Sequence, residues 1–150
     1  MSSDKLAREV RFELDQLRRM AASAAELAAV PAAERRAWDA AAGAKFVADL
    51  TIGLENLCKR RYRHLGLPSP TGPDSHARML EDFLREPDLG GSLPPETVVL
   101  LRQYLAFRHR FVHGYGHEVH WEMIVEPLKA LPEMIRTLAD IWERWLVSLR

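Results

Sequence analysis

The sequence predicts an all-α protein, an up-and-down bundle of four to five helices. Apolar residues recur at steps of three and four through most of the 150 residues, which places them on one face of a helix. Stretches rich in Gly and Pro, such as 66–73 and 89–95, separate these periodic segments. Sustained period-two alternation and Asn-Gly hairpins are absent from the sequence, so nothing indicates strands. The length suits one helical domain over residues 1–150.

Composition narrows the function classes. The formal net charge is zero, so the protein lacks a global basic footprint for nucleic acid and any RNA contact must be local. The single cysteine, Cys58, excludes an intramolecular disulfide and fits a reducing cytosol. The first twenty residues are charged throughout and do not resemble a signal peptide. Since no stretch approaches the roughly 20 apolar residues that span a bilayer, we expect a cytoplasmic protein without a membrane segment.

The first helix begins at the capping sequence of residues 2–4 and ends at Pro31, which cannot continue a helix. Its charged residues Arg11, Glu13, Arg18 and Arg19 are expected on a solvated face. The core face should consist of apolar residues at helical spacing: Leu6, Val10, Leu14, Leu17, Ala24 and Leu27.

The second helix is predicted from Ala33 to residue 64 or 65. Its core seam steps by three and four: Val47, Leu50, Leu54 and Leu57. The helix ends in a basic cluster of Lys59, Arg60, Arg61, Arg63 and His64. These cations either contact phosphates or complement the negative end of the helix dipole.

After the loop at 66–73, Asp74 or Ser75 caps a short third helix over residues 76–87. His76 lies in its first turn, either as a neighbour of the functional site or as a surface residue. Pro94 and Pro95 begin the fourth helix. The last helix occupies 121–150, but Pro127 and Pro132 interrupt its first half. It is therefore expected to start properly near Pro132, with a kinked segment before it.

The most informative stretch is 101–121, LRQYLAFRHRFVHGYGHEVHW, which holds four of the six histidines. Helical periodicity runs to His113, and Gly114 and Gly116 supply helix-stop chemistry through the left-handed backbone that Gly tolerates. On a helical wheel Arg108 lies in the apolar half, where a charge needs a partner or an anionic ligand. Arg108 and His113 lie about 140° apart on a continuous helix. They converge only if the helix ends between them or a second copy supplies one of them.

The pattern Arg108-x4-His113-x-Tyr115 resembles the Arg-x(4–6)-His motif of HEPN domains, and more closely the Arg-x4-His-x-Tyr motif of HepT-type toxins. The string FRHRFVHGYGHEVHWE at 107–122 is similar to a HepT-like subgroup. The position after the arginine is polar in that motif, often Asn, and is His109 here.

The resemblance implies a HEPN-like bundle that acts as a metal-independent endoribonuclease toxin without a cofactor, cleaving RNA in a homodimer groove. Arg108 and His113 would be catalytic, with His109 and Tyr115 in support. Imidazole suits a general base near neutral pH, and the permanent charge of arginine suits a phosphate. The resemblance also implies an MntA-type nucleotidyltransferase antitoxin that attaches AMP to Tyr115.

Three alternatives stay open from the residues alone. His109 and His113, with His117 or Glu118, have a spacing that can bind zinc. Arg108 can instead pair with a core carboxylate while the histidines only line a helix end. The chain would then be a non-catalytic bundle that binds a nucleotidyltransferase. As a third alternative, Tyr115 only packs over the helix end and is not modified. A Cys–His nucleophile has no support, because nothing places a base near Cys58.

Overall fold

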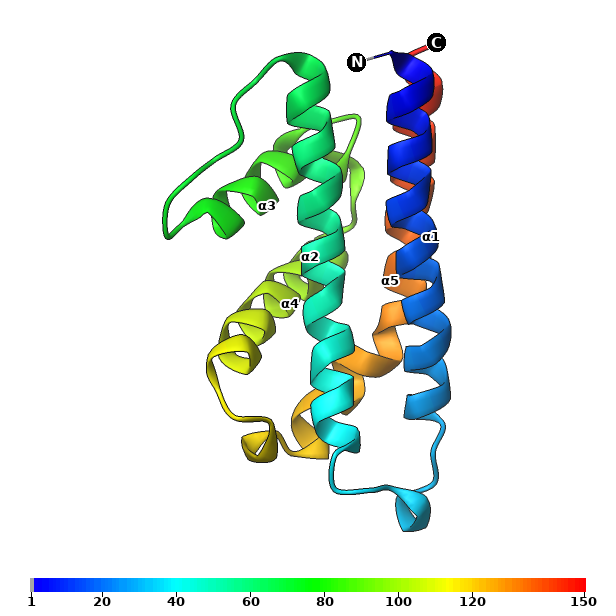
Figure 1. The fold of residues 1–150 in the computed structure, drawn as a ribbon, viewed down its shortest axis with the longest axis vertical. Coiled ribbons are helices and arrows are strands. Elements are labelled where there is room, and N and C mark those ends of the chain that lie inside the picture. Colours follow the sequence, from blue (N-terminus) through cyan, green and yellow to red (C-terminus); the bar gives the residue numbers. More distant parts are fainter. Residues whose placement is uncertain (1) are drawn as a thin grey trace.

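The computed structural model describes residues 2–150 and contains five α-helices (Figure 1). Their bounds are α1 Ser3–Ala28, α2 Asp39–Leu65, α3 Ser75–Arg85, α4 Pro95–His113 and α5 Trp121–Ser148. Three short 3-10 turns connect them: η1 Ala32–Glu34, η2 Gly90–Ser92 and η3 Gly116–Glu118. Strands are absent from this described part of the chain, so the predicted all-α bundle is confirmed.

Three long helices, α1, α2 and α5, pack side by side along the bundle (Figure 1). The chain runs down α1, up α2 and finally up α5, so both termini lie at the same end. Helices α3 and α4 cover the other side of α2. Trp142 and Tyr104 are the largest fully buried side chains of the core that unites these helices. Between residues 2 and 150, no helix combines the length and the hydropathy needed to cross a bilayer.

The core face of α1 was predicted correctly for Leu6, Val10, Leu14, Leu17 and Ala24, which are buried, while Leu27 is half-buried. A cap bond from the backbone N–H of Lys5 to Ser2 Oγ, at 3.3 Å, begins the helix.

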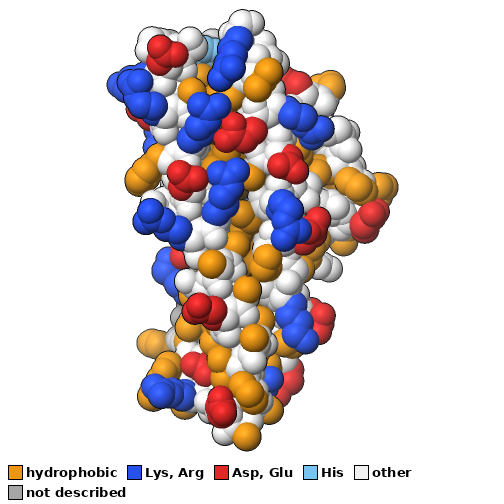
Figure 2. Space-filling view, turned by 90° about the vertical axis from the view of Figure 1, so that its right-hand side faces the viewer, with side chains coloured by type: hydrophobic (Ala, Val, Ile, Leu, Met, Phe, Trp, Pro, Cys, Tyr) orange, Lys and Arg blue, Asp and Glu red, His pale blue; other side chains and the backbone are white. Residues whose placement is uncertain are grey.

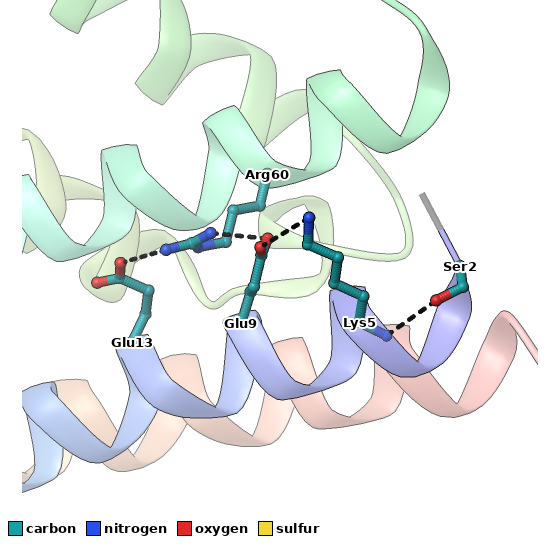
Figure 3. Close-up of polar contacts among 5 residues, drawn as sticks. All are labelled: Ser2, Lys5, Glu9, Glu13 and Arg60. Carbon is teal, nitrogen blue, oxygen red and sulfur yellow. Dashed lines mark hydrogen bonds and ion pairs between the residues drawn. The ribbon is translucent and has the colours of Figure 1, made fainter.

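The expectation that the charged face of α1 is solvated was wrong for Glu13, whose side chain is only 13% exposed. Figure 3 shows Arg60 of α2 reaching between two carboxylates of α1. Its guanidinium donates to Glu9 Oε2 at 2.8 Å and to Glu13 Oε1 at 2.9 Å. Arg61 pairs with Glu86 at 3.4 Å. Two members of the basic cluster are therefore engaged with carboxylates, which weakens its interpretation as a phosphate-binding surface.

Helix α2 begins at Asp39 and not near Ala33 as predicted. The Asp39 carboxylate accepts a hydrogen bond from the backbone N–H of Arg36 at 2.8 Å. Such a local side chain–backbone bond competes with the helix and holds the preceding residues in a turn. In addition, Arg35 lies over the Trp121 ring, with its Cζ 4.3 Å from the ring centroid. The loop before α2 is thus fastened to the start of α5 by a cation–π contact.

Helix α5 is continuous from Trp121, so the prediction of a proper start near Pro132 was wrong. Both prolines lie inside the helix, and Figure 1 shows a bend in its orange first half. Proline removes a helical hydrogen bond, but Ile124, Pro127 and Leu128 are buried against the rest of the bundle. Tertiary packing therefore retains the helix where the local sequence opposes it.

Figure 2 shows the face formed by the α1 side of the bundle, where Lys and Arg side chains alternate with Asp and Glu. One ion pair of this kind joins Arg11 of α1 to Glu143 of α5 at 3.3 Å. Because charges of both signs are interspersed, this face lacks the basic stripe that is typical of a nucleic-acid surface. The residues predicted as the functional site belong to α4, on the opposite side of the bundle (Figure 1).

Candidate functional site

Helix α4 is anchored in its first half and projects outward in its last two turns. Pro95 occupies its first turn, and Leu101 and Tyr104 are buried. The Tyr104 hydroxyl donates to the carbonyl of Pro127 in α5 at 2.7 Å, and burial raises the Tyr104 pKa above its ordinary value. By contrast, Val112 is 56% exposed and His113 is exposed. The predicted motif thus lies at the accessible end of an anchored helix.

The helix ends at His113, as predicted, but not for the predicted reason. Gly114 is extended, with φ −103° and ψ 167°, and Gly116 does not have a positive φ either. Glycine at this position allows the backbone to pass close to the helix end. A Cβ on Gly114 would lie 3.2 Å from the carbonyl oxygen of Arg110. A side chain at this position would push the turn away from the helix end.

Arg108 has the partner that its place in the apolar half required. Its side chain is 19% exposed, and its Nη1 lies 3.9 Å from Oε1 of Glu55 in α2. That distance gives charge compensation but is too long for a hydrogen bond. The Nε of Arg108 is buried and has no hydrogen-bond partner within residues 2–150. The Glu55 carboxylate therefore compensates the charge of the guanidinium, but the Nε of Arg108 makes no hydrogen bond within residues 2–150.

Glu55 is the site residue that the sequence analysis missed. It is a buried carboxylate, 8% exposed, and the same Oε1 atom lies 2.7 Å from Nδ1 of His76 in the first turn of α3. A signal for it exists in the sequence: Glu55 is four residues after Thr51 and three before Cys58, both buried on the same face of α2. A carboxylate in that row predicts a charged or hydrogen-bonded partner.

A small cavity of about 20 Å³ adjoins Glu55 and His76, and it is lined mainly by apolar side chains of α2, α3 and α4. This volume suffices for about one water molecule. Cys58 also lines the cavity. Burial raises the pKa of its thiol to about 12, so the thiol is neutral at physiological pH and unsuited to nucleophilic chemistry.

A single chain does not bring Arg108 and His113 together. Because α4 is continuous from Pro95 to His113, the two side chains leave the helix about 140° apart. Val112 lies between them, about 40° from Arg108 and about 100° from His113. The exposed valine therefore separates the two motif residues on the outer surface of the helix.

The remaining motif residues surround the helix end. The rings of His109 and His113 are 4.9 Å apart between centroids, in an edge-to-face arrangement. Tyr115 is 73% exposed and stacks on His117 at 5.7 Å, rather than packing in the core. Within the described part of the chain, no three His, Cys, Asp or Glu side chains are grouped as a metal site.

The HepT-like protein family matches residues 42–148 of this chain. The chain belongs to the HepT-like family. The matched segment contains Glu55, His76 and the whole motif from Arg108 to Tyr115. Comparisons with curated proteins and with solved structures give no significant match. The residues that resemble the HepT motif, Arg108, His113 and Tyr115, lie in the last two turns of α4 and directly after it.

Proposed function

We propose that this HepT-like protein is a metal-independent endoribonuclease toxin of the cytoplasm, controlled by a nucleotidyltransferase antitoxin. Arg108 and His113 of two subunits form each active site in a homodimer groove. The observation that supports this most is the apolar surface at the end of α4: Val112 is 56% exposed between the two motif residues, and the partly buried Phe107 and Phe111 lie on the same two turns.

A two-fold axis near Val112 accounts for the separation of the motif residues. In an isologous dimer the same patch of each copy faces the other. Val112 would pack near the axis, with Arg108 of one copy facing His113 of the other. Two equivalent sites result, and each takes one residue from each subunit. The partly buried rings of Phe107 and Phe111, stacked at 5.7 Å, extend the apolar surface of the same two turns.

The two groups supply the general base and the phosphate-binding charge that RNA cleavage by transphosphorylation needs. His113 accepts the proton of the ribose 2′-hydroxyl as the oxygen attacks phosphorus. Arg108 binds the phosphate and stabilises the charge that develops on its oxygens. Nη1 of Arg108 lies 3.9 Å from Glu55 and makes no hydrogen bond to it, so it can donate to a phosphate, which a guanidinium binds through paired N–H groups. His109, whose ring touches that of His113, supports the base.

Tyr115 is the proposed control point. Its 73% exposure makes the hydroxyl accessible to another enzyme, and it is two residues from His113. AMP on this hydroxyl would add a phosphate that bonds to Arg108 of the other subunit, and its bulk would exclude RNA from the groove. Incubation with ATP, magnesium and an MntA-type nucleotidyltransferase should add AMP to the wild type but not to Tyr115→Phe, as read by intact mass. An adduct that persists on Tyr115→Phe would place the switch elsewhere.

The activity is tested by RNA cleavage in EDTA. His113→Ala should lower the rate by about 10²–10⁴-fold because it removes general base catalysis. Arg108→Ala should lower it by about 10²–10³-fold, because it removes a charge at the transition state. His120→Ala is the matched control, because His120 is exposed and makes no side-chain cap bond to α5. Loss of activity in EDTA, or activity that survives both site variants, contradicts the proposal.

A second candidate function is a non-catalytic HEPN bundle that binds a nucleotidyltransferase. The contact of Arg108 with the buried Glu55, at 3.9 Å, favours it, since a core carboxylate can hold an arginine for purely structural reasons. In that case the wild type would not cleave RNA, and Arg108→Ala would lower the melting temperature instead of an activity.

A further inference from the structure

The Glu55–His76 pair, which the motif does not include, lies on the same side of α4 as Arg108. Glu55 Oε1 contacts His76 Nδ1 at 2.7 Å and Arg108 Nη1 at 3.9 Å. Three helices, α2, α3 and α4, therefore bring a carboxylate, an imidazole and a guanidinium to one point. Because one carboxylate oxygen, Oε1 of Glu55, contacts both His76 and Arg108, these two side chains must lie close to each other.

The orientation of the imidazole follows from its partner. An ionised carboxylate has only acceptors, so Nδ1 of His76 must be the donor to Glu55. Nε2 is then the second ring nitrogen, and it makes no hydrogen bond to other residues in the described range 2–150. The His76 side chain is 41% exposed while that of Glu55 is 10% exposed. The pair thus has a buried, fixed end and an accessible end, which is how carboxylates orient catalytic histidines.

RNA transphosphorylation also needs a proton donor for the leaving group, and neither Arg108 nor His113 has that role in the proposed site. The bond from the 2′-oxygen to phosphorus forms while the bond from phosphorus to the 5′-oxygen breaks. One group takes the 2′-hydroxyl proton, and another must give a proton to the departing 5′-oxygen. Arg108 does not deprotonate in proteins, so it cannot be that donor.

We propose that His76 is the general acid of this reaction and that Glu55 is its positioning residue. This inference rests on the proposed ribonuclease function. A phosphate bound to Arg108 would have His76 of the same subunit nearby, since both groups contact one Glu55 oxygen. His113 of the other subunit takes the 2′-hydroxyl proton, and His76 gives its Nε2 proton to the 5′-oxygen. The products are a 2′,3′-cyclic phosphate and a 5′-hydroxyl, and His76 regains a proton from water.

The test compares two short oligoribonucleotides, one normal and one with sulfur in place of the 5′-bridging oxygen at a single linkage. A thiolate leaves without protonation, so loss of a general acid should slow cleavage of the oxygen substrate only. We expect His76→Ala to cleave the oxygen substrate at least about 100-fold more slowly than the wild type. Cleavage of the sulfur substrate should stay close to the wild-type rate.

His76→Asn separates catalysis from structure, because its side-chain amide can still donate to Glu55 but cannot supply an acidic proton. It should be as defective as His76→Ala on the oxygen substrate. Equal losses on both substrates, restored activity in His76→Asn, or an unchanged rate in His76→Ala would each overturn the role of His76. These results leave the ribonuclease itself standing. If the wild type cleaves neither substrate, the proposed function fails and the role of His76 fails with it.

Discussion

Substitution of Tyr104 by Phe tests the anchoring of α4, on which the geometry of the site depends. Tyr104 is fully buried, and its hydroxyl donates to the Pro127 carbonyl at 2.7 Å. Removal of the hydroxyl costs the net stability of one hydrogen bond, about 1 kcal/mol, and up to about 3 kcal/mol if the carbonyl is left unpaired. For a chain of this length each kcal/mol lowers the melting temperature by roughly 2–4 °C.

Thermal unfolding followed by circular dichroism measures this effect. One protein concentration is used throughout, because the melting temperature of the proposed dimer would depend on concentration. Tyr115→Phe is the matched control: it removes the same atom from a side chain that is 73% exposed. A surface change of this kind should alter stability by less than about 0.5 kcal/mol. Equal melting temperatures for Tyr104→Phe and Tyr115→Phe would refute the claim that this bond fixes α4 against α5.

Three other outcomes follow from the structure. Cys58, with its thiol pKa raised to about 12 by burial, should resist alkylation at pH 8 until denaturant is added; rapid modification of the native protein, read by mass, would contradict the packing of α2. Burial raises the pKa of Tyr104 above its ordinary value, so the folded state keeps the phenol neutral at a pH where the unfolded state ionises. The stability that this neutral phenol contributes is therefore lost as the pH rises beyond about 10. Unfolding free energy should therefore fall in that range, and less so in Tyr104→Phe. Finally, Val112→Glu should yield a monomer of unchanged helicity in light scattering, whereas a dimer that survives this charge would move the interface away from Val112.

The helices could largely be predicted from the sequence because their cores repeat at three and four residues. The predicted wheel also placed Arg108 in the apolar half, and the structure shows it 19% exposed beside Glu55. Two errors are local: the start of α2 at Asp39 and the extended backbone of Gly114 at the end of α4. The error in α5 concerns long-range contacts. Pro127 was expected to break α5, but its burial and its bond with Tyr104 are tertiary features that local propensity does not contain.

The site was predictable only in part for the same reason. The motif is contiguous, so Arg108, His113 and Tyr115 could be proposed from their resemblance to the HepT motif. Glu55 and His76 are 53 and 32 residues before Arg108 in the chain, and only the packing of α2, α3 and α4 brings them to it. A carboxylate in the buried row of α2 indicates that a partner exists, but the identity of that partner depends on the fold.

Complementation between two inactive variants tests most directly the claim that each site is shared by two subunits. Arg108→Ala and His113→Ala are purified separately, mixed in equal amounts, unfolded and refolded together, and assayed for RNA cleavage in EDTA. Random pairing makes half of the dimers mixed, and each mixed dimer has one intact site of two, so about a quarter of the wild-type activity should return. If Arg108 and His113 acted within one subunit, the mixture would stay as inactive as either variant alone, and the shared site would be contradicted.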